Sequence, residues 1–224
     1  SAGGSAKQAR DRKTQAILPL RGKILNVASA SAEKLRANQE LNDLMQAIGC
    51  GTGENYSENS LRYEKIIIMT DADVDGAHIA SLLMTFFYRQ TPKLIENGHL
   101  FLAMPPLFRI TQGGQTYYAK DEAHKDEIIN EQLSSKTKIE ISRFKGLGEM
   151  PASQLKETTM CPEKRNLLKI TVPNLDCLET NSMKSKPMTR LEVDKTVDTL
   201  MGKKPELRFA YLQENAKFVT SIDV

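Results

Sequence analysis

The stretch Lys65-Ile66-Ile67-Ile68-Met69-Thr70-Asp71-Ala72-Asp73-Val74-Asp75-Gly76-Ala77-His78-Ile79 decides the fold of this 224-residue chain. Its short apolar run at 66–69 is bounded by charge and is β-branched, which predicts a buried strand of a parallel sheet. Gly76 then opens a segment with helical spacing of apolar residues, namely Ile79, Leu82, Leu83, Phe86 and Phe87. A buried strand followed directly by a helix indicates an α/β fold.

Three carboxylates follow the predicted strand at alternate positions: Asp71, Asp73 and Asp75. In open α/β sheets ligands bind at the carboxyl ends of the strands, where these acids lie. Three carboxylates at close range cannot all stay ionised without a compensating cation. Oxygen ligands of this kind suit a hard divalent ion, so the stretch predicts a Mg²⁺ site.

Three other interpretations of this stretch remain open. The pattern also begins an EF-hand loop, but position twelve is Leu82 instead of Glu, and a strand precedes it instead of a helix. A strand ending in Asp-x-Asp is similar to the haloacid dehalogenase-like phosphatases, in which the first Asp is a nucleophile, although no other acids of that family are evident downstream. Finally, one Asp could simply cap the following helix, but capping needs only one.

The length, the apolar runs and the cysteines of the chain limit the class of protein it can be. The length suits one large domain or a domain with an appendage. No apolar run approaches a membrane span, and the start at Ser1 without Met or signal peptide indicates an excised fragment. The thiols of Cys50, Cys161 and Cys177 have no metal-site spacing, which favours reduced cytosolic cysteines.

The net charge of +3 is small, but residues 1–23 are locally basic. Asp11 is the local counter-charge to Lys7, Arg10, Arg12, Lys13, Arg21 and Lys23. A solvated helix face is the usual meaning of such a run. The small residues at 1–6 would also let a backbone approach phosphates closely, although the spacing of a P-loop is absent.

The periodicity of the remaining chain predicts its other elements. We expect helices over 31–48, 76–95 with a kink or restart at Pro92, 121–133, from 151 onward, 188–201 and 205–219. We expect strands over 99–104 and 138–142, a hairpin of 107–110 with 116–119, and a loop over 174–187.

Four segments together resemble one family. They are Ser1-Ala2-Gly3-Gly4-Ser5-Ala6-Lys7-Gln8, Leu18-Pro19-Leu20-Arg21-Gly22-Lys23-Ile24-Leu25-Asn26, Asp71-Ala72-Asp73-Val74-Asp75-Gly76 and Lys145-Gly146-Leu147-Gly148-Glu149-Met150. In this order they resemble the carboxyl-terminal half of the B subunits of bacterial type IIA topoisomerases. The short span from Tyr117-Tyr118 to Lys145 is most similar to the topoisomerase IV branch, with the gyrase branch close behind.

The resemblance implies a fold and a domain plan. The fold is α/β: a TOPRIM, Rossmann-like parallel sheet flanked by helices, with a C-terminal, mostly helical tail. The TOPRIM domain would span 1–115, a hairpin and loop continuation with the Lys145–Met150 segment would span 116–160, and the helical tail would span 161–224.

The resemblance also implies an activity and its partners. In this family the tyrosine of a partner A subunit cleaves and religates double-stranded DNA, so no Tyr of this chain is expected to attack. Mg²⁺ is the implied cofactor, while ATP is bound by a domain outside this chain. The implied partners are the DNA backbone, the A subunit and a second B subunit in an A2B2 assembly in the cytoplasm, with no membrane.

Site residues carry over position by position. Asp71 and Asp73 match the family's metal ligands, and Asp75 would ligate directly, through water, or hold the loop. His78 is as well explained by a core or capping role as by catalysis. Candidates for DNA phosphate contact are Lys7, Arg12, Lys23 and Lys145, and the drug-proximal position is Arg21, which aligns near the quinolone site.

One departure from the family motif changes the expectation for this chain. The motif is Glu-Gly-Asp-Ser-Ala-Gly-Gly, and the chain begins at its Ser, without the Glu that would act as metal ligand or general acid. We therefore expect the chain alone to bind metal weakly and not to cleave DNA. The alternatives are a stand-alone TOPRIM nuclease or primase-like protein, a phosphatase with Asp71 as nucleophile, and a DNA-binding module without catalysis.

Overall fold

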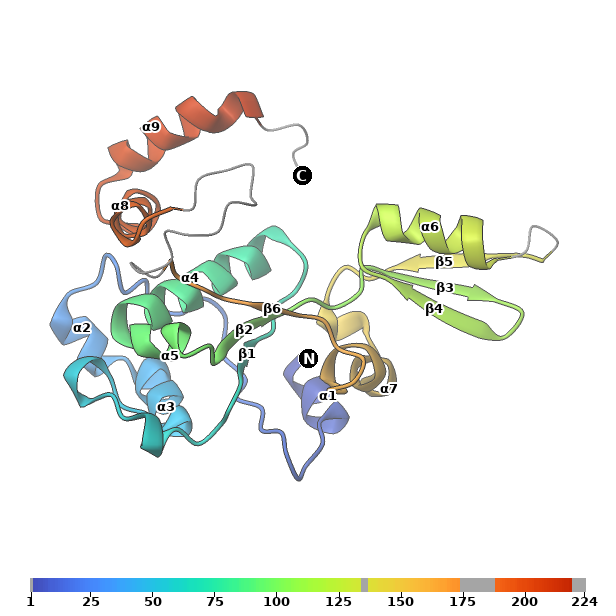
Figure 1. Ribbon diagram of the computed structural model, residues 1–224, viewed down its shortest axis with the longest axis horizontal. Helices are drawn as coiled ribbons and strands as arrows, with labels where there is room; N and C mark the ends of the chain where they lie inside the picture. The colour runs from blue at the N-terminus through green and yellow to red at the C-terminus, as the bar shows by residue number, and fades with distance from the viewer. Residues whose placement is uncertain (1, 134–136, 174–187, 219–224) are drawn as a thin grey trace. The chain divides into compact units, whose positions relative to one another are not determined.

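The computed structural model describes residues 2–133, 137–173 and 188–218 (Figure 1). Its contacts divide the chain into two compact units that alternate along the sequence. The first unit contains Ser1–Pro19, Ile67–Ala80 and Phe101–Leu168, and the second contains Leu20–Ile66, Ser81–Leu100 and Lys169–Val224. Because these units interleave, they do not test the consecutive boundaries at residues 115 and 160, which stay predictions.

The elements of the described residues combine helices with short strands. The helices are α1 (Ala2–Ala9), α2 (Ala32–Ala37), α3 (Gln39–Ile48), α4 (Val74–Gln90), α5 (Pro92–Glu96), α6 (Glu122–Gln132), α7 (Ala152–Leu155), α8 (Arg190–Met201) and α9 (Pro205–Asn215). Short 3-10 or π turns are η1 (Gly53–Asn55), η2 (Glu58–Ser60), η3 (Leu147–Glu149), η4 (Lys156–Met160) and η5 (Ala216–Phe218). The strands are β1 (Ile66–Ile68), β2 (Leu100–Ala103), β3 (Phe108–Gln112), β4 (Gln115–Ala119), β5 (Glu140–Arg143) and β6 (Leu167–Lys169). The predicted α/β class with a helical tail is confirmed.

One sheet has the strand order β1-β2-β6. Helices α4 and α5 connect β1 to β2, which is the crossover of a βαβ unit. Strand β6 runs antiparallel to β2, because the Ile170 N–H donates to the Leu100 carbonyl and the Met104 N–H to the Asn166 carbonyl, both over 3.0 Å. The sequence did not predict β6, since three residues are too few to show a period; an antiparallel edge strand on such a sheet is common.

The second sheet has the order β4-β3-β5 (Figure 1). It belongs to the first unit. Strands β3 and β4 form the predicted hairpin, with Phe108 opposite Ala119 and Gln112 opposite Gln115. Helix α6 packs on this sheet around a core to which Phe108, Ala119 and the buried Ile128 contribute. Gly113 and Gly114 make the turn at φ of 56° and 84°, a region that favours glycine.

Two predicted helices are divided in the structure. The prediction of one helix over 31–48 is wrong, because the Asn38 side chain accepts a hydrogen bond from the Leu41 N–H at 3.0 Å and starts α3 as a separate helix. Pro92 restarts the helix as α5, as expected for a residue without an N–H. Helices α8 and α9 confirm the two tail helices, whereas the predicted loop at 174–187 lies outside the described residues.

The tail helix α8 is fixed within the second unit by side-chain contacts to α4. The Tyr88 hydroxyl donates to Asp194 Oδ1 at 2.9 Å, and Arg89 Nη2 donates to Asp198 Oδ1 at 2.5 Å. Helix α8 is therefore part of the folded second unit.

Two of the three cysteines lie among the described residues. Cys50 and Cys161 are free thiols, and Cys177 lies outside these residues. No helix in the described part of the chain is long and apolar enough to cross a membrane.

A network around Glu58 fixes the loop that leads into β1. Asn97 Nδ2 donates to Glu58 Oε2 at 2.7 Å, and Tyr56 Oη and His99 Nε2 also bond to this carboxylate. His99 Nδ1 lies within hydrogen-bonding distance, 2.7 Å, of the carbonyl oxygen of Glu64, which is two residues before β1. Hydrogen bonds from Tyr56, then Asn97 and His99, lower the pKa of Glu58 from its ordinary 4.5.

This lowered pKa predicts how stability depends on pH. A carboxyl whose pKa is lower in the folded chain stabilises the fold above the unfolded pKa, and this contribution is lost as pH falls through the folded pKa. We expect Glu58→Gln to reduce the free energy of unfolding at pH 7 and to flatten its decline below about pH 4.5. Urea unfolding of both proteins between about pH 7 and pH 3 measures this. If the unfolding free energies of the two proteins changed with pH in the same way, the hydrogen bonds to Glu58 would not depend on its charge.

Candidate functional site

Asp71 follows β1 and is half-buried in the first unit. Its Oδ1 accepts a hydrogen bond of 2.7 Å from the backbone N–H of Leu147, 76 positions along the chain. An N–H bond to an ionised carboxylate is shorter and stronger than one between neutral groups. The segment at 145–150 and the acidic loop, which carry two separate motifs of the sequence, therefore meet at this side chain.

Asp73 caps helix α4. Its Oδ1 accepts from the Gly76 N–H at 2.7 Å, and its carbonyl accepts from the Ala77 N–H at 2.9 Å. This is the geometry of an N-cap, so the capping interpretation holds for this one acid. The side chain is otherwise exposed, which leaves the carboxylate accessible at the protein surface.

The fold leaves no room for a side chain at Gly76. A Cβ built on Gly76 would lie 2.0 Å from the backbone carbonyl oxygen of Asp71. Any side chain there would force the first turn of α4 away from the end of β1. The glycine thus lets the acidic loop fold back tightly on itself.

The segment at 145–150 is a short turn with its own anchors. Glu149 Oε2 accepts from the backbone N–H of Lys145 at 2.8 Å, which closes the turn around η3. Leu147 and Met150 are 4% and 2% exposed and hold the turn in the core.

Helix α1 packs against the same segment. Ala6 and Ala9 are almost fully buried in one apolar cluster with Leu147, Met150 and Leu155. Small alanines allow this close contact, while Lys7 on the same helix is exposed. The basic N-terminal helix is therefore fixed to the turn that binds Asp71.

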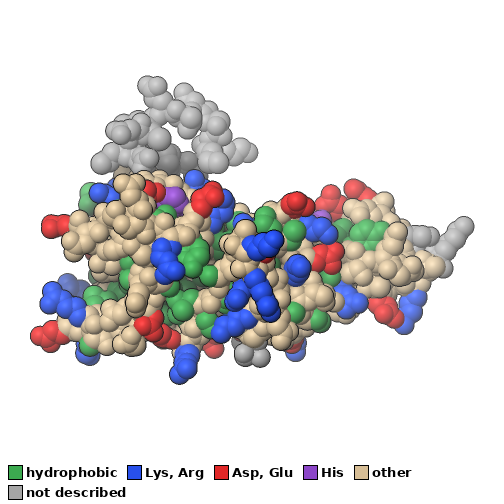
Figure 2. Space-filling view, turned by 90° about the horizontal axis from the view of Figure 1, so that it is seen from below, with side chains coloured by type: hydrophobic (Ala, Val, Ile, Leu, Met, Phe, Trp, Pro, Cys, Tyr) green, Lys and Arg blue, Asp and Glu red, His purple; other side chains and the backbone are tan. Residues whose placement is uncertain are grey.

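Three of the predicted basic side chains lie exposed at the surface of the first unit. Lys7, Arg12 and Lys145 are exposed and form no ion pair within residues 2–133, 137–173 and 188–218. Asp11, their expected counter-charge, instead accepts from the Lys13 N–H and the Thr14 hydroxyl, both at 2.9 Å. Figure 2 shows Lys and Arg side chains gathered over α1 and the segment after it.

Two further predicted residues belong to the second unit. Arg21 and Lys23 lie in an exposed turn around Gly22, whose φ is 83°. The Arg21 N–H donates to Glu40 Oε1 at 2.8 Å, which ties this turn to α3. The roles of Arg21 and Lys23 in drug and DNA contact stay predictions.

The three acids are not brought together as one ligand set. Within the described residues, no group of three or more His, Cys, Asp or Glu side chains could hold a metal ion. Asp75 and His78 are exposed on the first turns of α4. Mg²⁺ is commonly held by one or two carboxylates, with water and phosphate oxygens completing its coordination. Asp71, oriented by Leu147, and Asp73, oriented by Gly76, are oxygen donors that fit this mode.

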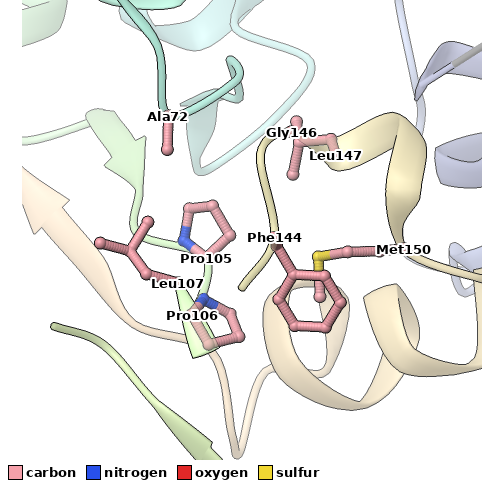
Figure 3. Close-up of a pocket in the computed structure, with 8 residues that line it drawn as sticks. All are labelled: Ala72, Pro105, Pro106, Leu107, Phe144, Gly146, Leu147 and Met150. Atoms are coloured by element: carbon pink, nitrogen blue, oxygen red, sulfur yellow. The ribbon is translucent and has the colours of Figure 1, made fainter. Parts of the chain in front are cut away.

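A small apolar pocket lies beside the Asp71 loop. Figure 3 shows it lined by Ala72, Pro105, Pro106, Leu107, Phe144, Gly146, Leu147 and Met150. Its free volume of about 10 Å³ is close to the space of one water molecule. This pocket is a small gap between packed side chains around the turn, and it is too small to hold a substrate.

Comparison with known proteins finds similar proteins for both parts of the chain. The model of the Toprim domain matches residues 1–105, and that of the carboxyl terminus of the DNA gyrase B subunit matches 136–213. The DNA topoisomerase 4 B subunit of Caulobacter vibrioides is 62% identical over 221 residues, covering 99% of this chain and 30% of that protein. The chain resembles the type IIA topoisomerase B subunits over almost its whole length. The Toprim fold and the family resemblance are confirmed.

Two further relatives show the range of sequence identity. The DNA topoisomerase 4 B subunit of Bartonella bacilliformis is 58% identical over 224 residues, covering all of this chain and 30% of that protein. The DNA gyrase B subunit of Halalkalibacterium halodurans is 47% identical over 224 residues, covering all of this chain and 33% of that protein. The chain thus spans about a third of the length of these relatives.

Two features of the site were not predicted from the sequence. Helix α1 contains Gly3 and Gly4, which weaken helix propensity, so only its burial against Leu147 and Met150 explains it. The Leu147 N–H is a backbone group, and no side-chain pattern reveals it. The two glycines around Leu147 were the available signal, because they allow close approach to another group.

Proposed function

We propose that this chain is the Mg²⁺- and DNA-binding part of a type IIA DNA topoisomerase B subunit, most similar to topoisomerase IV. It supports double-strand cleavage and religation by the tyrosine of a partner A subunit. The observation that carries the proposal is the hydrogen bond from Leu147 to Asp71, because it places the acidic loop on the same buried turn as the basic helix α1. The acidic residues proposed to bind Mg²⁺ and the exposed Lys7, Arg12 and Lys145 thus belong to one compact unit.

Asp71 and Asp73 would hold the ion, with Asp75 contributing directly or through water. When bound, Mg²⁺ offsets the negative charge that develops on the scissile phosphate and the leaving 3′ oxygen. The residues of this chain orient and position: Leu147 and Gly76 fix one oxygen of each carboxylate through their N–H groups. The attacking oxygen belongs to the A subunit, so this chain supplies no nucleophile.

The exposed Lys7, Arg12 and Lys145 would contact DNA phosphates, and Lys23 of the second unit would do the same. Such contacts fix the position of DNA without reading its sequence, so binding weakens steeply with salt. Arg21 would lie next to a quinolone bound at the cleavage site. These roles suit an enzyme that acts at many sequences.

This chain would act within a larger assembly. The B subunit would pair with an A subunit and a second B subunit as A2B2 in the cytoplasm, and ATP would be bound by another region of the B subunit. Identity of 62% and 58% to two topoisomerase IV B subunits, against 47% to a gyrase B subunit, favours topoisomerase IV.

The test is DNA cleavage, relaxation and decatenation by the B subunit containing this chain, mixed with its A subunit, in Mg²⁺ or in EDTA. We expect cleaved DNA only with Mg²⁺, and decatenation with ATP. Introduction of negative supercoils would instead assign the gyrase branch. Cleavage that persists in EDTA, or turnover of an aryl phosphate by this chain alone, would contradict the proposal, and the latter would favour Asp71 as a phosphatase nucleophile.

A further inference from the structure

The Asp71 carboxylate is held by a backbone group far along the chain. The Leu147 N–H lies 2.7 Å from Oδ1. Because a hydrogen bond to a carboxylate oxygen is directional, this contact sets the rotation of the side chain. Oδ1 is directed at the turn, and Oδ2 is the oxygen not used by this bond.

Gly146 makes room for this arrangement. Its φ of −170° and ψ of 169° are extended values that any residue adopts, so no backbone constraint calls for glycine. A Cβ built there would lie 2.9 Å from both Cγ and Oδ1 of Asp71 and 3.3 Å from Oδ2. The space taken by the carboxylate is therefore the reason that this position accepts only glycine without a shift.

The turn that carries these two groups is rigidly supported. Leu147 and Met150 are buried under α1, and Glu149 closes the turn onto the Lys145 N–H. On the preceding side, the Phe144 N–H donates to the Leu107 carbonyl at 2.8 Å, next to β3. Because the turn is anchored on both sides, the Leu147 N–H can hold the Asp71 carboxylate in one orientation, as groups that support metal-binding side chains do.

We propose that the Gly146–Leu147 peptide is a positioning element that turns Asp71 so that Oδ2 is presented to the metal ion. The inference rests on the proposed function, since it requires Mg²⁺ at Asp71. It adds that the metal requirement of this chain is set in part by a backbone N–H in the segment at 145–150. A merely structural bond would affect stability but not metal affinity.

The test uses the B subunit assembled with its A subunit and two variants. Gly146→Ala pushes the carboxylate away, and replacement of the Leu147 amide by an ester removes the N–H donor while keeping the side chain. We expect each to weaken Mn²⁺ binding, measured by electron paramagnetic resonance, by about 10- to 100-fold, as for other groups that orient metal ligands. The Mg²⁺ concentration for half-maximal DNA cleavage should rise by the same factor, and high Mg²⁺ should restore cleavage.

Gly114→Ala is the matched control, because a Cβ there meets nothing within 4 Å; it should leave both metal readouts unchanged. Unchanged Mn²⁺ affinity and Mg²⁺ requirement in the folded Gly146→Ala complex would overturn the inference. If that variant does not fold, the ester variant decides by the same criterion. Asp71→Asn separates the two proposals: if it loses metal binding while the positioning variants keep it, only this inference fails, whereas unchanged metal binding in Asp71→Asn contradicts the proposed function.

Discussion

Replacement of Asp71 or Asp73 by Asn is expected to abolish Mg²⁺-dependent DNA cleavage by the assembled topoisomerase. Removal of one preorganised electrostatic group costs about 10²- to 10³-fold in rate, and loss of a metal ligand should cost at least as much. ATP hydrolysis, which we place in another region of the B subunit, should continue. The measurement is the rate of double-strand cleavage at saturating Mg²⁺, with ATP turnover from the same preparation.

Asn is chosen because it preserves the local structure. Its amide oxygen can still accept from the Leu147 N–H at position 71 and from the Gly76 N–H at position 73, and Asn is a good helix N-cap. Asp121→Asn is a matched control, since Asp121 caps α6 by accepting from the His124 N–H at 2.8 Å. Its cleavage rate should equal that of the wild type. Unchanged cleavage in both site variants would end the assignment of these acids as metal ligands.

Gly76→Ala is expected to produce the largest loss of stability from a single added methyl group. Gly to Ala in a helix normally stabilises by roughly 0.5–1 kcal/mol, but here the new Cβ would lie 2.0 Å from the Asp71 carbonyl oxygen. The backbone would have to move, which costs about 3 kcal/mol. Chemical denaturation of the two proteins measures the difference.

Gly114→Ala separates this clash from the general effect of removing a glycine. Its φ of +84° is strained for Ala, but an added Cβ meets nothing within 4 Å, so we expect a loss of about 1 kcal/mol. Equal losses in the two variants would mean that the tight approach of α4 to β1 does not exist in solution.

Local pattern was sufficient for the elements that carry the acids. The β-branched run of β1 and the spacing of α4 are continuous in sequence, so their period shows directly, and the hairpin β3–β4 is marked by Gly113 and Gly114. Asn38 was not recognised as a helix start, because its capping bond competes with an otherwise continuous helical pattern. Strand β6 depends on pairing with β2, which is a tertiary effect.

The sequence indicated candidate side chains for the site but not the contacts that hold them. Three alternating acids and a basic segment predicted metal and phosphate chemistry, and both roles stay predictions. No local pattern indicates that Asp73 serves as a cap, that Asp71 bonds to Leu147, or that α1 packs under the turn at 145–150. The last two contacts join segments far apart in the chain, so they follow from packing and not from any local period.

The most direct measurement is anomalous diffraction from the proposed A2B2 complex with DNA and with Mn²⁺ in place of Mg²⁺. We expect a Mn²⁺ peak within about 2.0–2.2 Å of a carboxylate oxygen of Asp71, with Asp73 beside it and the scissile phosphate as a shared ligand. A Mn²⁺ peak held by other residues, with both of these carboxylates out of coordination range, would contradict the assignment of the metal site.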